Sequence, residues 1–251
     1  MSVVSCKVVC SALILAAALA GEGARILGVF PVPSLSHQVV YRALMTELAS
    51  RGHELVVITP EPIRDPAPAN YTQIDVSFMF DFYRKQFNFA SMKLDRMSQY
   101  DVIVALLGVG ERLCEMLLDH KPVTELISPN SMVHFDLVFV EWLDMLSLYS
   151  FAHKFSAPMI GISSLPPFGI GYSAVGNPIN PSYIPDIFMP YSDQMTFFER
   201  MDNFIYYMRM NYFFYSKLLP RHQAIADRTL RVFSSQFGSA SHQCQHAILQ
   251  L

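Results

Sequence analysis

This 251-residue sequence has no excess of basic over acidic residues, and its composition is not of low complexity. It has 18 Lys and Arg against 21 Asp and Glu, and charged residues make up only 16%. Nucleic-acid binding needs a basic face, and disordered chains are charge-rich and apolar-poor, so both classes are excluded. The low counts of 11 Gly and 16 Pro exclude a fibrous protein. The 52% of hydrophobic residues can fill the core of one large domain or two small ones.

Cysteine is scarce too, since the chain has four and two of them, Cys6 and Cys10, lie in the first ten residues. Cys114 and Cys244 could pair, but two cysteines do not make a disulfide framework. The apolar pattern around Cys114 favours a buried thiol instead. No CxxC or Cys/His spacing typical of zinc is present, so we expect no metal site.

Long hydrophobic runs are confined to the amino terminus. Lys7 precedes the apolar run 8–20, in which Ala18 and Ala20 fit a small-x-small cleavage site. We therefore expect a signal peptide at residues 1–20 and entry into the secretory pathway; a buried amino-terminal helix is the alternative. No later stretch offers about 18 uncharged apolar residues, so no transmembrane anchor is visible in the sequence.

An N-glycosylation sequon, Asn70-Tyr71-Thr72, follows the Pro-rich stretch at residues 60–69. A Pro-rich stretch of this kind is typical of an exposed loop. We therefore expect Asn70 to lie on the surface and to carry a glycan.

Short apolar runs with the length of buried strands recur along the chain. Their continuous hydrophobicity, and the helix-length segment between the first two, favour parallel strands. The expected strands are residues 26–30, 55–59, 71–76, 135–140 and 158–162. Helical patterns fall between them, so we expect an open α/β sheet.

The expected helices are defined by apolar spacing. After the first strand, Val40, Leu44 and Leu48 lie four residues apart on one face, and Ser36 is a plausible N-cap. Residues 101–118 begin like a strand but continue with helical spacing, and we interpret them as a helix. Further helices are expected at residues 78–96 and 143–155.

Aromatic residues concentrate at residues 195–219, after an irregular Pro- and Gly-rich connection. Their helical spacing fits a core-packing helix pair, which is where such residues usually lie. An apolar pocket for an acceptor molecule or a membrane-facing surface would use the same residue types. Phe197 and Phe198 are the candidates for acceptor contacts.

Two reactive side chains follow expected strand ends, where open parallel sheets bind their ligands. His37 follows the first strand, and Glu141 follows the strand 135–140. A carboxylate can hold a histidine in the tautomer that acts as general base, taking the proton of a hydroxyl while its oxygen attacks an electrophile. The sequence has no GxSxG motif and no GxGxxG after the first strand, which disfavours an esterase nucleophile and a classical NAD site.

Several separated blocks resemble the UDP-glycosyltransferase family, in particular its insect branch. They are ARILGVFPVPSLSHQVVYRALMTELASRGHELVVITP (24–60), FDLVFVEW (135–142), GNPINPSYIPDIFMPYSDQMTFFERMDNF (176–204) and LLPRHQAIAD (218–227). The blocks occur in the family's order, and the resemblance covers about residues 1–230.

The resemblance implies the amino-terminal, acceptor-binding half of a two-domain GT-B glycosyltransferase, a Rossmann-like parallel sheet with helices on both faces. We expect this domain at residues 21–230, a divergent tail at 231–251, and no donor-binding domain. The family's catalytic histidine falls on His37, and its supporting aspartate falls on Glu141, which is one methylene longer. Ser36 is expected beside the acceptor.

The implied reaction moves glucose or glucuronate from a UDP-sugar to a small lipophilic hydroxyl compound, with inversion at the sugar carbon. We expect no cofactor besides the co-substrate UDP-sugar, which the donor half would bind, so the chain alone should transfer little sugar. The implied location is the lumen of the endoplasmic reticulum, with peripheral membrane contact. The alternative is a non-catalytic, ligand-binding or regulatory protein that pairs with full-length relatives there.

Overall fold

The computed structural model describes residues 23–86, 97–143, 145–166, 171–172, 176–177 and 179–229. Its centre is a parallel five-stranded sheet in the order β3-β2-β1-β4-β5. The strands are β1 (Arg25–Val29), β2 (Glu54–Thr59), β3 (Tyr71–Asp75), β4 (Leu137–Glu141) and β5 (Met159–Ile162). All five expected strands are confirmed, and this strand order is that of a Rossmann-like fold.

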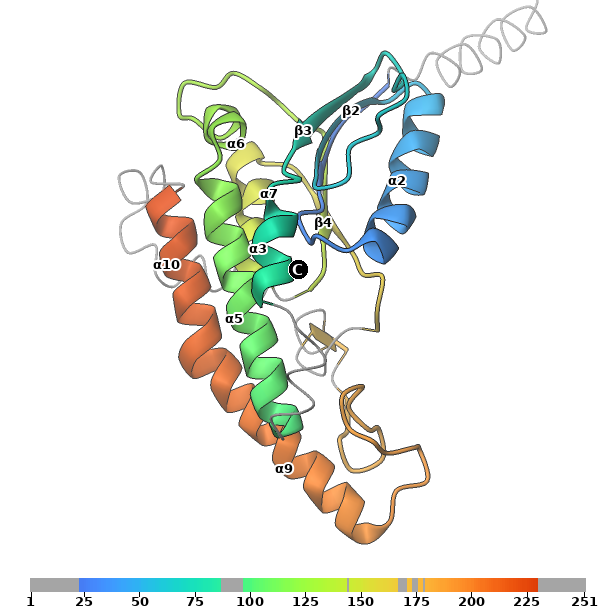
Figure 1. Cartoon of the computed structure of the whole chain (residues 1–251), viewed down its shortest axis with the longest axis vertical. Coiled ribbons are helices and arrows are strands. Elements are labelled where there is room, and N and C mark those ends of the chain that lie inside the picture. Colours follow the sequence, from blue (N-terminus) through green and yellow to red (C-terminus); the bar gives the residue numbers. More distant parts are fainter. Residues whose placement is uncertain are drawn as a thin grey trace, which may run out of the picture.

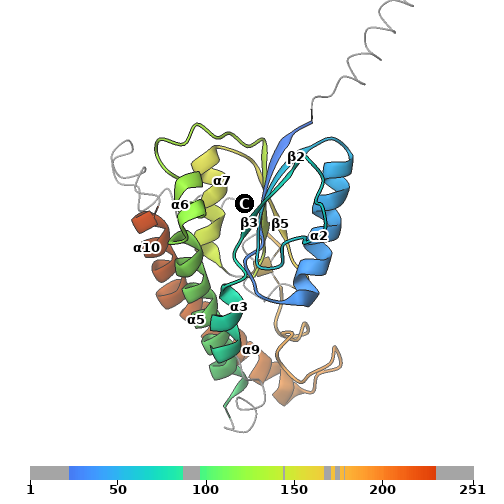
Figure 2. The same cartoon turned by 45° about the horizontal axis from the view of Figure 1, so that its top comes forward.

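Two cores lie on opposite faces of the sheet, because successive strand residues point to opposite sides. One core joins Ile26, Leu55 and Val57 to helix α2 (Leu35–Ser50). The other joins Leu27, Val56 and Ile58 to the helices of the opposite face. Figure 2 shows α2 alone on one side of the sheet and the remaining labelled helices on the other. The expectation of helices on both faces is therefore confirmed.

The face that helix α2 turns to the sheet agrees only in part with the apolar spacing of its sequence. Its buried residues are Gln38, Tyr41, Met45 and Ala49. Val40 is 47% exposed, so it does not belong to the buried face. Leu44 and Leu48 pack against this core, as the spacing predicts. The prediction fails for Val40, because the buried face extends instead to a polar residue, Gln38, which a pattern based on apolar spacing passes over.

The opposite face is covered by several helices (Figure 1). They are α3 (Met79–Gln86), α5 (Gln99–Leu118), α6 (Lys121–Leu126), a 3₁₀ turn (Leu146–Tyr149) leading into α7 (Ser150–Phe155), and α10 (Leu219–Thr229). The helix expected at 101–118 is confirmed. Of the helix expected at 78–96, residues 87–96 lie outside the described residues.

A long helix crosses below the sheet and carries an exposed apolar stripe. Helix α9 (Phe197–Phe213) begins at a capping box of Thr196 and Glu199 and continues through a π-helical turn (Phe214–Leu218) into α10. Its inner residues, such as Tyr206 and Met210, are buried as a core-packing helix requires. The exposed stripe consists of Phe197, Phe198, Met201, Phe204, Ile205, Met208, Tyr212 and Tyr215. Figure 1 shows α9 extending away from the sheet.

Several expectations about the ends of the chain lie outside the described residues. They are the signal peptide at 1–20, the tail at 231–251 and any pairing through Cys244. The thiol of Cys114 is free and fully buried. Within the described part of the chain, no helix is long and apolar enough to cross a membrane.

Candidate active site

His37 and Glu141 meet at the carboxyl edge of the sheet. Strands β1 and β4 are hydrogen-bonded neighbours and parallel, so the residues that follow β1 lie beside the end of β4. Nδ1 of His37 lies 2.7 Å from Oε1 of Glu141. Because an ionised carboxylate only accepts, Nδ1 carries the proton and Nε2 keeps its lone pair. This is the tautomer that a general base needs at Nε2.

The Glu141 carboxylate is fully buried and accepts two more hydrogen bonds. The backbone N–H of Val32 donates to Oε2 at 3.2 Å, and the Tyr41 hydroxyl donates to Oε1 at 3.2 Å. Burial raises the pKa of the Glu141 carboxyl, while the bonds from His37, Val32 and Tyr41 oppose that rise. Three donors, one from the loop after β1 and two from α2, thus converge on one carboxylate.

Gln38 fixes the loop that presents His37. Its Nε2 donates to the carbonyls of Phe30 and Val32, both at 3.0 Å. Its Oε1 accepts a bond of 2.9 Å from the Thr59 hydroxyl at the end of β2. All of these groups are buried, so their hydrogen bonds are costly to break. Gln38 therefore ties the start of α2 to the ends of β1 and β2 and holds the adjacent His37 in place.

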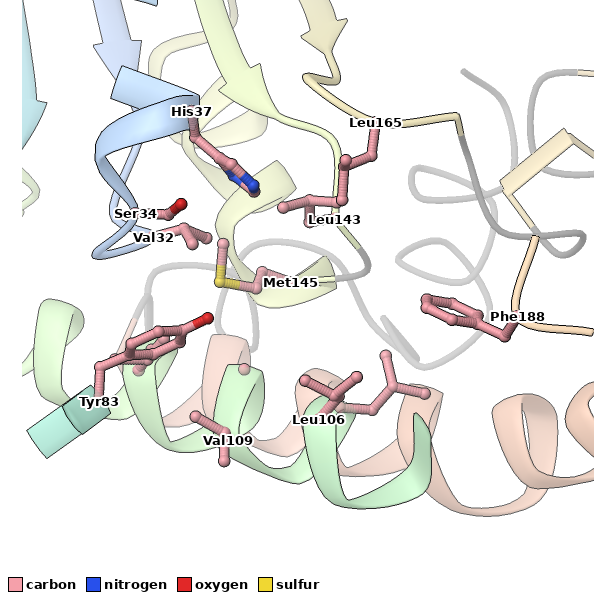
Figure 3. A pocket seen from close by; sticks show the side chains of 13 residues that line it. Val32, Ser34, His37, Tyr83, Leu106, Val109, Leu143, Met145, Leu165 and Phe188 are labelled. Carbon is pink, nitrogen blue, oxygen red and sulfur yellow. The ribbon is translucent and has the colours of Figure 1, made fainter. Parts of the chain in front are cut away.

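A cavity of about 310 Å³ opens beside His37. Its walls are mainly apolar side chains of α5 and of the segments that follow β4 and β5 (Figure 3). Ser34, His37 and Tyr83 supply its polar side chains. The remaining lining residues are Val32, Leu106, Leu107, Val109, Gly110, Leu113, Leu143, Met145, Leu165 and Phe188. This volume lies at the small end of the range for ligand pockets.

The structure does not bring the other expected acceptor residues to this cavity. Ser36 is exposed in the first turn of α2, and its hydroxyl lies 3.0 Å from that of Ser34. Ser34 is the N-cap residue and lines the cavity in its place. Phe197 and Phe198 are 70% and 78% exposed at the start of α9. Phe188, in the connection before α9, and Tyr83 of α3 are the aromatic residues that line the cavity.

Asn70 is a structural residue in this fold, contrary to the expectation of a free surface side chain. It is half-buried, and its Nδ2 donates to the carbonyls of Ala49 at 2.8 Å and His53 at 2.7 Å. A glycan would be attached to this same nitrogen. Both hydrogens of Nδ2 are thus engaged, and a glycan on this nitrogen would displace one of the two bonds.

The sequence analysis did not predict that Tyr41 contacts Glu141 or that α5 lines the cavity. Tyr41 follows His37 by four residues, and this spacing places both on one face of a helix. That spacing was the available signal for their meeting at Glu141. On α5, the apolar side that lines the cavity has the same composition as a core-facing side. Among the described residues, no group of His, Cys, Asp and Glu could hold a metal ion.

The fold and the site define an α/β domain in which a histidine–carboxylate pair faces an apolar cavity. Comparison with known proteins then assigns the family. Residues 25–241 match the family described as UDP-glucoronosyl and UDP-glucosyl transferase. This chain belongs to that family.

The similar proteins include insect and mammalian members. UDP-glycosyltransferase UGT5 of Dactylopius coccus is 35% identical over 73% of this chain and 35% of its own length. UDP-glucuronosyltransferase 1-2 of Rattus norvegicus is 24% identical over 92% of this chain and 44% of its own length. The solved structure of LpCGTa in complex with UDP is 15% identical, covers 75% of this chain and 43% of that chain, and gives a TM-score of 0.31. The chain therefore spans less than half the length of these relatives.

Proposed function

We propose that this chain is the acceptor-binding half of a UDP-glycosyltransferase and that His37 is its general base. The observation that carries the proposal is the bond of 2.7 Å between His37 Nδ1 and Glu141 Oε1 at the wall of an apolar cavity. Nε2 of His37 takes the proton of the acceptor hydroxyl while that oxygen attacks the anomeric carbon of the sugar. The bond between that carbon and the UDP oxygen breaks, UDP leaves with the electron pair, and the configuration inverts.

Glu141 supports this step by its charge and its position. The proton that arrives on Nε2 makes His37 an imidazolium, and the neighbouring carboxylate stabilises that cation. Because the carboxylate is buried, the interaction is stronger than it would be in water. The extra methylene of Glu, relative to the Asp that the resemblance implies, does not prevent contact with His37.

The cavity favours a small lipophilic acceptor with a hydroxyl group, such as a phenol. Most of its wall is aliphatic, which favours an apolar body, and His37 supplies the basic group for the hydroxyl. Glucose or glucuronate would come from a UDP-sugar held by a donor half. We expect residues 25–229 alone to transfer little sugar, because the sugar and the acceptor must be held together for transfer. We place it in the lumen of the endoplasmic reticulum, with Asn70 unmodified.

The exposed stripe of α9 favours a second function, pairing with a longer relative or contact with a membrane surface. Large contiguous apolar surfaces mark interaction sites, and this stripe carries eight large hydrophobic residues. In that role the chain would bind ligands or regulate without catalysing transfer. Co-purification with a full-length relative tests the pairing, and recovery of the chain alone under all conditions contradicts it.

A fusion to a donor half tests the catalytic assignment. Residues 25–229 would be joined to the carboxy-terminal half of UGT5 of Dactylopius coccus, and transfer from UDP-glucose to 1-naphthol would be measured. We expect His37→Ala to abolish transfer, since its loss removes the base. His134→Ala is the matched control, because its side chain is 71% exposed and does not line the cavity. Retained transfer in His37→Ala contradicts the assignment of the base.

A further inference from the structure

Tyr41 and His37 donate to the same oxygen of Glu141. The Tyr41 hydroxyl lies 3.2 Å from Oε1, and His37 Nδ1 lies 2.7 Å from that atom. The two residues are one helical turn apart on α2, so a single rigid element supplies both donors. Oε2, the other oxygen, accepts from the backbone of Val32.

Tyr41 is itself held firmly. It is 1% exposed, and its ring stacks on Phe30 with centroids 4.3 Å apart and planes 10° apart. Phe30 directly follows β1, which pairs with β4, so the ring is anchored to the sheet that carries Glu141. Burial, and then the charge of Glu141, raise the pKa of the Tyr41 hydroxyl well above its usual value. The hydroxyl therefore remains a hydrogen-bond donor throughout the range in which proteins function.

We infer that Tyr41 is a positioning residue of the proposed active site: its hydroxyl donates to the Glu141 carboxylate and fixes it in place, so that His37 presents Nε2 to the cavity. This inference rests on the proposed function only in giving Nε2 a substrate. Tyr41 does not line the cavity and acts on His37 through Glu141. The contacts of Tyr41 and His37 with Glu141 are already present in the folded chain and need no bound ligand.

Removal of the hydroxyl has two physical consequences. Without that donor the ionised carboxylate is less stable, so Glu141 takes up a proton at a higher pH. The loss of a hydrogen bond to a charged group corresponds to a shift of about one to two pH units in the Glu141 midpoint. While Glu141 is still ionised, Oε1 loses a competing donor and accepts a stronger bond from His37 Nδ1.

The test is an NMR titration of the full chain labelled with ¹³C at the Glu carboxyl carbons and with ¹⁵N in the His rings. The Glu141 carboxyl signal is assigned by its loss in Glu141→Gln. In Tyr41→Phe we expect the Glu141 midpoint to rise by about one to two pH units and the His37 Nδ1 proton to move downfield. The unmutated chain should show His37 with the proton on Nδ1.

Tyr71→Phe is the matched control. Tyr71 is buried in the same core cluster as Tyr41 but lies on β3, which is separated from β4 by two strands. We expect the Glu141 midpoint and the Nδ1 proton to stay at their wild-type positions in this variant. An equal shift in both variants, or no shift in Tyr41→Phe, overturns the inference.

A second measurement follows the Tyr41 ring itself in the otherwise unmutated chain. With 3-fluorotyrosine in the chain, the fluorine signal that Tyr41→Phe removes or Glu141→Gln displaces belongs to Tyr41. We expect this signal to titrate at the same pH as the Glu141 carboxyl, and a signal that ignores that titration overturns the inference. Neither measurement depends on sugar transfer. A failed fusion enzyme would therefore contradict the proposed function and leave this result standing.

Discussion

His37 and Glu141 are 104 positions apart in the sequence, yet Nδ1 of the first lies 2.7 Å from Oε1 of the second. The parallel pairing of β1 with β4 brings them together, because both residues follow or end strands at the same edge of the sheet. The geometry leaves the second ring nitrogen of His37 for the cavity.

Replacement of Glu141 by Gln should separate stability from activity. Burial raises the pKa of Glu141 above its usual 4.5, so the folded state binds the proton more tightly than the unfolded state. Stability therefore falls as pH rises from 4.5 toward the folded value, and at pH 7 the buried charge is destabilising. We expect Glu141→Gln to raise the unfolding temperature at pH 7 but not at pH 4, while the fusion enzyme loses transfer.

Glu125→Gln is the control for this prediction, since Glu125 is exposed on α6. We expect no change in its unfolding temperature at either pH. A lower unfolding temperature for Glu141→Gln at pH 7 would mean that the hydrogen bonds to the carboxylate outweigh the cost of its burial.

Gly110 offers a way to fill the cavity from α5. A Cβ atom at this position would lie 3.5 Å from Cγ of Met145, which is ordinary contact, so a side chain can be added. We expect Gly110→Phe to occupy the cavity and to weaken 1-naphthol binding at least about tenfold, a loss of about 1.4 kcal/mol. Calorimetric titration measures the change.

Gly108→Phe serves as the partner variant on the same helix. Gly108 is exposed, and a Cβ there meets nothing within 4 Å. The affinity of the Gly108→Phe variant for 1-naphthol should equal that of the wild type. Equal weakening in both variants would show that the effect comes from α5 and not from the cavity.

His222 should make the fold sensitive to acid. It is fully buried on α10, where Nδ1 accepts from the Ser147 backbone at 3.4 Å, and Nε2 has no partner among the described residues. Burial lowers the pKa of His222 to about 4. The unfolded state binds the proton from about pH 6.5 downward, so stability is complete above pH 6.5 and is lost as pH falls toward 4.

The contribution lost is about 3 kcal/mol, from a shift of about 2.5 units at 1.36 kcal/mol each. In His222→Gln this part of the acid dependence should vanish, because Gln does not titrate. Urea unfolding at pH 7 and pH 4.5 measures it, with the exposed His134→Gln as control. The same acid dependence in His222→Gln and wild type would assign it to other groups.

Asn70 should matter for stability and should carry no glycan. An aspartate at this position would point oxygens at the carbonyls of Ala49 and His53, so Asn70→Asp should cost about 2 kcal/mol of unfolding free energy. Thr72→Ala destroys the same sequon at an exposed position and should cost little. A mass loss on treatment of the secreted chain with an N-glycosidase, abolished in Thr72→Ala, would contradict this account.

The sheet was predictable because its strands are continuous apolar runs separated by helical patterns. The five strands at residues 26–30, 55–59, 71–76, 135–140 and 158–162 all appear at those places. The meeting of His37 with Glu141 was also within reach, because parallel strands end at one edge. The pattern of apolar runs does not determine the order of the strands in the sheet, and it is this order that places β4 beside β1.

The buried polar residues were the part that sequence reasoning could not supply. Gln38, Tyr41 and Asn70 are each defined by partners that lie far away in the sequence or in another element. A pattern of apolar spacing treats such residues as surface positions. Aromatic side chains caused the opposite error, because Phe197 and Phe198 are exposed on α9 while Phe188 reaches the cavity.

The central claim, an acceptor-binding half with its own cavity, is tested most directly by calorimetry on the chain alone. UDP-glucose and 1-naphthol would be titrated separately into the purified protein. The account predicts saturable, one-to-one binding of 1-naphthol and no heat of binding from UDP-glucose. Saturable binding of UDP-glucose, or no binding of 1-naphthol, would contradict it.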